Sequence, residues 1–215
     1  MNRTDPKYGV YLSILNEELV PAMGCTEPIA LAYAAALARQ TLGTLPEEIL
    51  IQVSGSIIKN VKSVVVPNTG NGKGLKLAAA AGAAAGKAEK ELEVIADVTP
   101  EQTEEILQYL AATPICIEHV ETGHVFDITV KVCAAGDTAV VRICDYHTHV
   151  VLIQKNDTVL RNIPVDDLEN TAMPDRSLLD LDDIWDFALT CELDDVRELL
   201  DRQIQYNTAI AREGL

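Results

Sequence analysis

A cysteine stands directly before a predicted helix in the segment Gly24-Cys25-Thr26-Glu27-Pro28. The leading N–H groups of a helix are unpaired and carry roughly half a positive charge, which favours a thiolate over a thiol. Cys25 is therefore a candidate general base or nucleophile, although the carboxylate of Glu27 acts in the opposite direction. The alternative is a small packed residue in a turn. Spacing alone favours that alternative, because no His, Asn or Asp adjoins the cysteine.

A second candidate site is the glycine-rich loop of residues 68–74, which begins Asn68-Thr69-Gly70 and leads into an Ala-rich helix. Backbone N–H groups in such a loop, together with the helix dipole, can hold a carboxylate or a phosphate. The glycine spacing matches neither the P-loop nor the dinucleotide-binding motif. A plain start of a helix is the alternative, and the missing nucleotide motif favours it.

Two histidines, His147 and His149, lie two positions apart between predicted strands. Residues at this spacing on a strand point the same way and could bind a metal with a third ligand. No H-E-x-x-H or C-x-x-C pattern accompanies them, so a hairpin corner with exposed imidazoles is the favoured interpretation. His119 and His124 are isolated and indicate nothing by themselves.

The composition excludes several classes of protein. The chain has 215 residues, is 48% apolar, and carries 33 acidic against 17 basic side chains, for a net charge of -16. Such a charge opposes binding to nucleic acid and to anionic membrane surfaces. The longest apolar runs are about half of the roughly 20 residues that span a bilayer. Five cysteines, an odd number without a C-x-x-C pair, favour reduced thiols in the cytoplasm.

Apolar periodicity and turn residues predict an α+β fold with helices packed on a mostly antiparallel sheet, as one unit over residues 1–215. Gly82 and Gly86 lie one turn apart, which predicts a helix that another backbone approaches closely. Helices are expected over residues 6–19, 29–41, 75–87 and 100–112, and strands over residues 48–53, 61–66, 92–96, 125–133, 138–144 and 150–154.

Thirteen acidic residues occur between positions 166 and 201. A solvated helix face is a better explanation than a cation site, because an apolar stripe runs through the same segment. We expect this stripe to face a core; its members are Leu178, Leu181, Ile184, Trp185 and Leu189.

Taken in order, several segments resemble the first half of the L-cysteine desulfidase family, also described as serine dehydratase alpha-chain-like. The resemblance covers nearly all of the chain and departs from the family pattern at Ser56 and His149, where asparagine is common. The segments are residues 23–30 with the G-C-T-E-P element, 54–60, 66–70, the His147-Thr148 corner and 207–215.

This resemblance implies a lyase without pyridoxal phosphate that removes the β-substituent and the α-proton of L-cysteine or L-serine. The products would be pyruvate, ammonia and sulfide or water. It implies a [4Fe-4S] cluster held by three cysteines of a second, C-terminal half of the enzyme. That catalytic half would act in cis or in trans, so this chain alone is expected to be inactive. The resemblance also implies that Cys25 abstracts the proton.

The resemblance and the loop chemistry together give a set of expected site residues. Cys25 is expected to be catalytic, and no metal ligand is expected in this chain, since the other cysteines are interpreted as small buried residues. The alternatives are a non-catalytic amino-acid-binding, anion-binding or regulatory domain and an independent thiol enzyme. The sequence does not decide between cysteine and serine as substrate, or whether the chain forms a homo-oligomer. The expected substrate-binding residues are Thr26, Glu27, Lys59, Asn60, Asn68, Thr69, Gly70, His147 and Thr148.

Overall fold

The computed structural model describes residues 1–165 and 174–215, and the chain divides into two compact units where the sequence predicted one. One unit comprises residues 22–168, and the other comprises residues 1–21 together with 169–215. Three of the thirteen acidic residues, Asp166, Asp167 and Glu169, lie outside the described residues.

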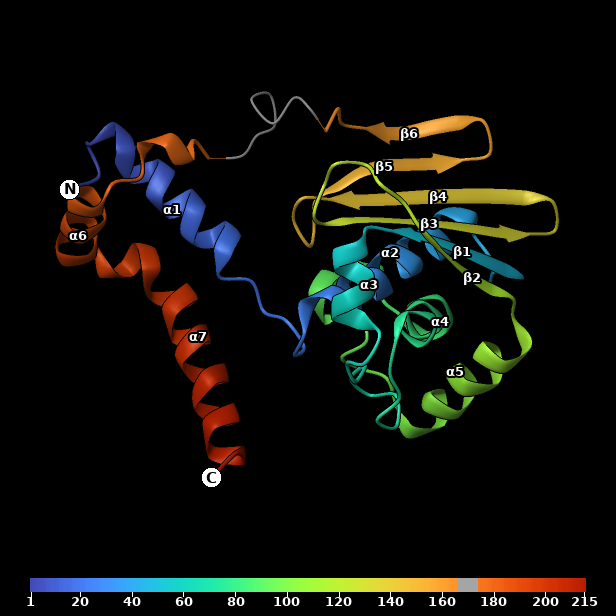
Figure 1. Ribbon diagram of the computed structural model, residues 1–215. Coiled ribbons are helices and arrows are strands. Elements are labelled where there is room, and N and C mark those ends of the chain that lie inside the picture. The colour runs from blue at the N-terminus through green and yellow to red at the C-terminus, as the bar shows by residue number, and fades with distance from the viewer. Residues whose placement is uncertain (166–173) are drawn as a thin grey trace. The chain divides into compact units, whose positions relative to one another are not determined.

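The larger unit contains a six-stranded sheet with helices on one face, which confirms the predicted α+β fold (Figure 1). The pair β2 and β1 at one edge is parallel, and every other neighbouring pair is antiparallel. In spatial order the strands are β2 (Ile115–His119), β1 (Glu48–Val53), β3 (Asp127–Ala134), β4 (Asp137–Cys144), β5 (Val150–Lys155) and β6 (Thr158–Asn162).

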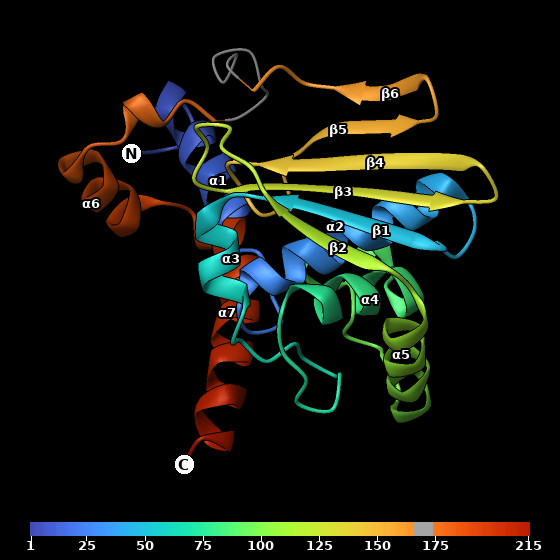
Figure 2. The ribbon, with the colours of Figure 1, turned by 45° about the vertical axis from the view of Figure 1, so that its right-hand side comes forward.

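Helix α2 (Thr26–Leu42) packs against β3, β4 and β5, so it is buried along most of its length. Alanine and leucine dominate this helix, and every residue from Pro28 to Ala36 is buried. Helix α4 packs on α2, and α5 packs on α4 (Figure 2). The other helices of this unit are α3 (Gly55–Val61), α4 (Leu75–Ala85), the 3-10 helix η1 (Ala88–Glu93) and α5 (Pro100–Ala112).

The close approach expected at Gly82 is confirmed. A Cβ atom built on Gly82 would lie 2.0 Å from the carbonyl oxygen of Ala32 in α2. At Gly86 it would lie 2.9 Å from the Cβ atom of Ala36. The two glycines therefore let α4 lie close against the middle of α2, at Ala32 and Ala36.

Two predicted strands are wrong. Val61 is the last residue of α3, and residues 62–66 follow it as a turn in which Val65 forms only an isolated bridge to Lys73. Residues 92–96 belong to the end of η1 and the turns after it. Each segment contributes some buried apolar side chains to the core, namely Val61 and Val66 in the first and Leu92, Val94 and Ile95 in the second. Periodicity cannot distinguish such short apolar runs from buried strands. Conversely, the short strands β2 and β6 escaped prediction because most of their residues are exposed.

The smaller unit is helical in its described part. Phe187 packs between the rings of Tyr8 and Tyr11, each 5.3 Å away. The prediction that the apolar stripe faces a core is wrong, since Trp185 is 68% and Leu181 is 85% exposed. Phe187 supplies the buried face of α6 instead. The elements of this unit are α1 (Pro6–Glu18), the 3-10 helix η3 (Arg176–Leu178), α6 (Leu181–Thr190) and α7 (Leu193–Glu213).

Within the described ranges, none of the helices combines the length and the apolar character needed to cross a membrane.

Candidate functional site

The thiol of Cys25 and the carboxylate of Glu27 form a hydrogen-bonded pair at the first turn of α2. Gly24, with φ 74°, turns the chain so that Cys25 becomes the N-cap residue in an extended conformation. The Sγ atom donates to Oε2 of Glu27 over 3.1 Å. Cys25 is exposed and Glu27 is half-buried, so a small molecule can reach the pair from solvent.

Asn60, from α3, holds the other carboxylate oxygen. Its Nδ2 atom donates to Oε1 of Glu27 over 3.1 Å. Burial acts to raise the pKa of Glu27, but the hydrogen bonds from Cys25, from its own backbone N–H and from Asn60 outweigh burial and lower the pKa. Glu27 is therefore an ionised carboxylate at neutral pH.

The thiol of Cys25 responds in the opposite direction from the one expected at a helix N-terminus. Partial burial of the sulfur raises its pKa above the ordinary value, and the hydrogen bond and negative charge of Glu27 raise the pKa further. The prediction of an acidified thiolate is therefore wrong. A neighbouring carboxylate that accepts the thiol proton outweighs the helix dipole, so the resting pair is a thiol beside a carboxylate.

His147 is the imidazole-bearing partner of the start of α2. Its Nε2 atom shares a hydrogen bond of 2.8 Å with Oγ1 of Thr26, and its ring packs edge-on against Phe126 at 4.6 Å. Burial lowers the pKa of His147, while the charge of Glu27 partly opposes the shift. The imidazole hydrogen-bonded to Thr26 is thus neutral at pH 7 and feels the charge of the Glu27 carboxylate.

Five of the expected site residues form hydrogen bonds at the start of α2, in two sets: Cys25, Glu27 and Asn60 in one, and Thr26 with His147 in the other. The other expected residues are placed differently. The amide of Asn68 donates to the carbonyl oxygens of Ile95 and Ala96, and the buried hydroxyl of Thr69 donates to that of Val66. These bonds fasten the loop to its own surroundings.

Three further expected residues, Lys59, Thr148 and Gly70, lie outside these two hydrogen-bonded sets. Lys59 is exposed beside Asn60 on α3 and has no ion pair among the described residues. The backbone carbonyl oxygen of Thr148 accepts a hydrogen bond from the N–H of Val150. Gly70, with φ 68°, is a turn residue against Thr103.

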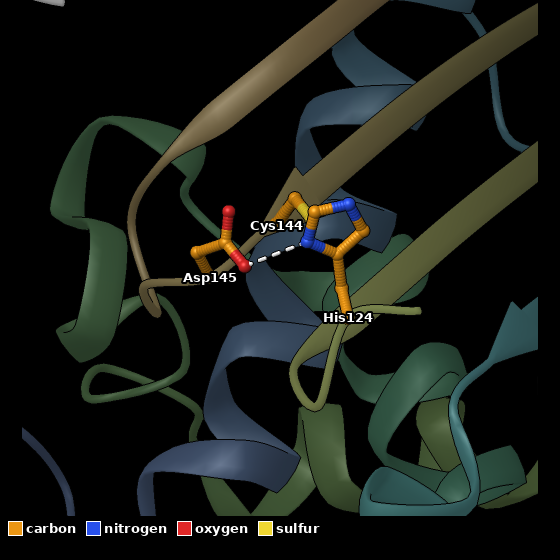
Figure 3. Close-up of side chains that lie close together, drawn as sticks. All are labelled: His124, Cys144 and Asp145. Carbon is orange, nitrogen blue, oxygen red and sulfur yellow. Dashed lines mark hydrogen bonds and ion pairs between the residues drawn. The ribbon is translucent and has the colours of Figure 1, made fainter. Parts of the chain in front are cut away.

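A separate cluster of His124, Cys144 and Asp145 was missed by sequence reasoning (Figure 3). One ligand-type atom of each residue lies within 4.8 Å of the other two. Cys144 is buried, as expected of the cysteines other than Cys25, but that expectation is wrong for Cys116, which is exposed in β2. The sequence alone indicated no partner for His124. The signal that could have found it is the β3–β4 hairpin, whose register brings residues before β3 next to residues after β4.

The described residues do not fit a [4Fe-4S] cluster. The five free cysteines lie on different elements: Cys25 before α2, and the others in β2, β3, β4 and after α6. The group of metal-ligating side chains found among the described residues contains a single cysteine, Cys144. Such a cluster needs three thiolates from one neighbourhood, so this chain's own residues do not hold it.

No protein-family model matches the chain. Curated relatives do match it along its whole length. A protein from Desulfitobacterium hafniense is 47% identical over 215 residues, covering 100% of this chain, and one from Treponema denticola is 44% identical over 217 residues. A third, from Fusobacterium nucleatum, is 42% identical over 95% of this chain. These relatives are all named UPF0597 proteins. The chain spans about half the length of the UPF0597 proteins that it matches, 50%, 50% and 48% in these three cases.

This comparison corrects the family assignment made from the motifs. Relatives that match 97–100% of the chain are named UPF0597 proteins and not serine dehydratase alpha-chain-like proteins. The resemblance rested on short segments in order, and short segments do not fix a family by themselves. The contacts at the start of α2 therefore become the basis for any inference about activity.

Proposed function

We propose that this chain forms part of a lyase that takes the α-proton from a small amino acid and expels its β-substituent, with L-cysteine or L-serine as substrate. The observation that carries the proposal is the hydrogen bond from the Cys25 thiol to the Glu27 carboxylate. The pair shares one proton at an exposed helix start, which is an arrangement suited to proton transfer. The chain spans about half of its relatives, so the complete catalyst includes further polypeptide.

The proton inventory of the proposed reaction closes on these two residues. Glu27 accepts the thiol proton, and the thiolate of Cys25 then removes the α-proton of the substrate. The electron pair of the broken C–H bond forms the Cα–Cβ double bond as the Cβ–S or Cβ–O bond breaks. Glu27 gives its proton to the departing group, which leaves as hydrogen sulfide or water, and Cys25 keeps the α-proton, so the thiol and the carboxylate are both restored. The resulting aminoacrylate hydrolyses to pyruvate and ammonia. Because the pKa of the Cys25 thiol is raised, its thiolate is a stronger base once formed.

The surrounding residues take positioning roles in this proposal. Asn60 orients the carboxylate of Glu27 through its hydrogen bond. The hydrogen bond between Thr26 and His147 positions the first turn of α2. Lys59, exposed next to Asn60, supplies a positive charge for the substrate carboxylate. The five free cysteines favour a reducing compartment, so we place the proposed reaction in the cytoplasm. The proposed reaction does not use pyridoxal phosphate.

The experiment combines this chain with the remaining half of the Desulfitobacterium hafniense relative, under anaerobic conditions with iron and sulfide supplied. Pyruvate and sulfide are measured with L-cysteine, and pyruvate and ammonia with L-serine. We expect turnover that Cys25→Ala abolishes and that the matched variant Cys133→Ala retains. Amino-acid binding without product, or turnover unchanged in Cys25→Ala, would contradict the proposal. Binding alone would instead favour the regulatory domain.

A further inference from the structure

Three chemically different metal-ligating side chains converge at one end of the β3–β4 hairpin. Cys144 is the last residue of β4, Asp145 follows it, and His124 lies in the segment before β3. Their ligand-type atoms lie within 4.8 Å of one another, and Nδ1 of His124 lies 2.9 Å from Oδ1 of Asp145 (Figure 3).

The backbone explains why neighbouring side chains gather here. Successive residues of a strand normally point to opposite faces. Asp145 has φ 66°, and its N–H donates to the carbonyl oxygen of Phe126 over 2.9 Å. This left-handed residue breaks the alternation, so Cys144 and Asp145 approach the same imidazole.

An unsatisfied oxygen is the second observation. Oδ2 of Asp145 is buried and has no hydrogen-bond partner within the ranges that the structure describes. Leaving a buried carboxylate oxygen without a partner is unfavourable, because the oxygen has lost its contact with water and gained no hydrogen bond in exchange. Oδ1 already accepts from His124, so a bound cation would supply what the second oxygen lacks.

The charges of the surroundings suit a divalent cation. With a thiolate at Cys144 and a carboxylate at Asp145, the cluster would offer two negative charges to a bound cation. The guanidinium of Arg142 lies 4.0 Å from the Cys144 sulfur, but it is paired to the buried carboxylate of Asp127 at 2.7 Å. A bound dication would take the place of the Cys144 thiol proton, and the thiolate and the carboxylate would together balance its charge.

We propose that His124, Cys144 and Asp145 bind a divalent transition metal of the zinc class. One nitrogen, one thiolate and one carboxylate are the ligand types that Zn²⁺ takes, at about 2.0–2.3 Å. Three protein ligands leave a fourth position of the tetrahedron for water or a small ligand. His124 also lines a surface hollow of about 420 Å³ together with Thr122, Arg142 and Asn162, which gives a small ligand a route to the cluster.

The test uses this full chain, stripped with a chelator and then given Zn²⁺ or Co²⁺. We expect about one metal per chain by elemental analysis. The Co²⁺ form should show the thiolate-to-metal absorption band and the intense visible bands of a tetrahedral site. Removing one ligand should weaken binding by more than the ~10–100-fold typical of a group that only supports a ligand.

The variants are Cys144→Ala, Asp145→Asn and His124→Gln. The His124 side chain is 23% exposed, so His124→Gln decides the test if burial of Cys144 prevents its variant from folding. Cys133→Ala and His119→Gln are the matched controls and should bind like the parent. Absence of bound metal, a Co²⁺ spectrum without the thiolate band, or binding that all three ligand variants retain would overturn the proposal. None of these readouts depends on elimination at Cys25, so the two proposals fail separately.

Discussion

Replacing Glu27 by glutamine is expected to slow the elimination by about 10²–10⁴-fold, the range that a positioned proton acceptor contributes. The amide keeps the shape of the side chain but cannot accept the proton of the Cys25 thiol. The measurement is the initial rate of pyruvate formation in the reconstituted mixture of the two halves. Asn60→Asp is the companion variant, because it replaces the donor to Glu27 with a second carboxylate, and it should slow the reaction less than Glu27→Gln does.

The double variant Cys25→Ala/Glu27→Gln sharpens this prediction. If the two residues move one shared proton, removing both costs no more than the more damaging single change, because groups that act as a unit are strongly non-additive. Losses that multiply would show that the residues act separately, and the pair would then not be the proton-transfer device.

Replacing Gly82 by alanine is expected to destabilise the larger unit by about 3 kcal/mol, since overpacking a tight core costs about 1–3 kcal/mol and occasionally more. The added methyl group would meet the backbone of Ala32 at 2.0 Å, and backbone cannot move aside as a flexible side chain does. The melting temperature, followed by circular dichroism, should fall by about 6–12 °C for a domain of this size.

Gly9→Ala is the matched control for this change. Gly9 also lies within a helix, α1, but a Cβ atom there meets nothing within 4 Å. Helix propensity alone predicts that both substitutions stabilise by about 0.5–1 kcal/mol. Opposite signs for the two variants would confirm the close approach of α4 to α2, and stabilisation by both would contradict it.

The sequence predicts most reliably those helices and strands whose ends have capping or turn residues. Helix α5 has Thr99 before Pro100 and Gln102 three residues on, and the structure contains the corresponding capping box. The β3–β4 hairpin has alternating apolar residues and turns at Gly136. Residues 61–66 lack such markers, and their apolar run fits a buried turn as well as a strand.

Some contacts of the candidate site can be predicted from the sequence, and others depend on the fold. Cys25 and Glu27 are two residues apart, so their proximity is evident in the sequence alone. The direction of the Cys25 pKa shift is not evident in the sequence. Burial and the hydrogen bond to Glu27 raise this pKa while the helix dipole lowers it, and the structure is needed to compare these effects. The contact of Thr26 with His147, 121 residues away, depends on how the sheet packs on α2.

The thiol–carboxylate pair is tested most directly by the pH dependence of Cys25 alkylation in this chain, followed at the Cys25 peptide by mass spectrometry. Cys116→Ala removes the other exposed thiol. Only the thiolate reacts, so the midpoint of the rate profile reports the pKa of the thiol. Below that pKa the pair holds its shared proton, and above it both groups are negative.

We expect the midpoint to lie above the ordinary cysteine value of about 8.5 and to fall when Glu27 becomes glutamine, because the carboxylate that accepts the thiol proton is gone. Glu27→Gln should thus make Cys25 react faster with the alkylating agent at neutral pH while slowing the elimination. A midpoint below the ordinary value, or one that Glu27→Gln leaves unchanged, would contradict the thiol–carboxylate pair on which the proposed function rests.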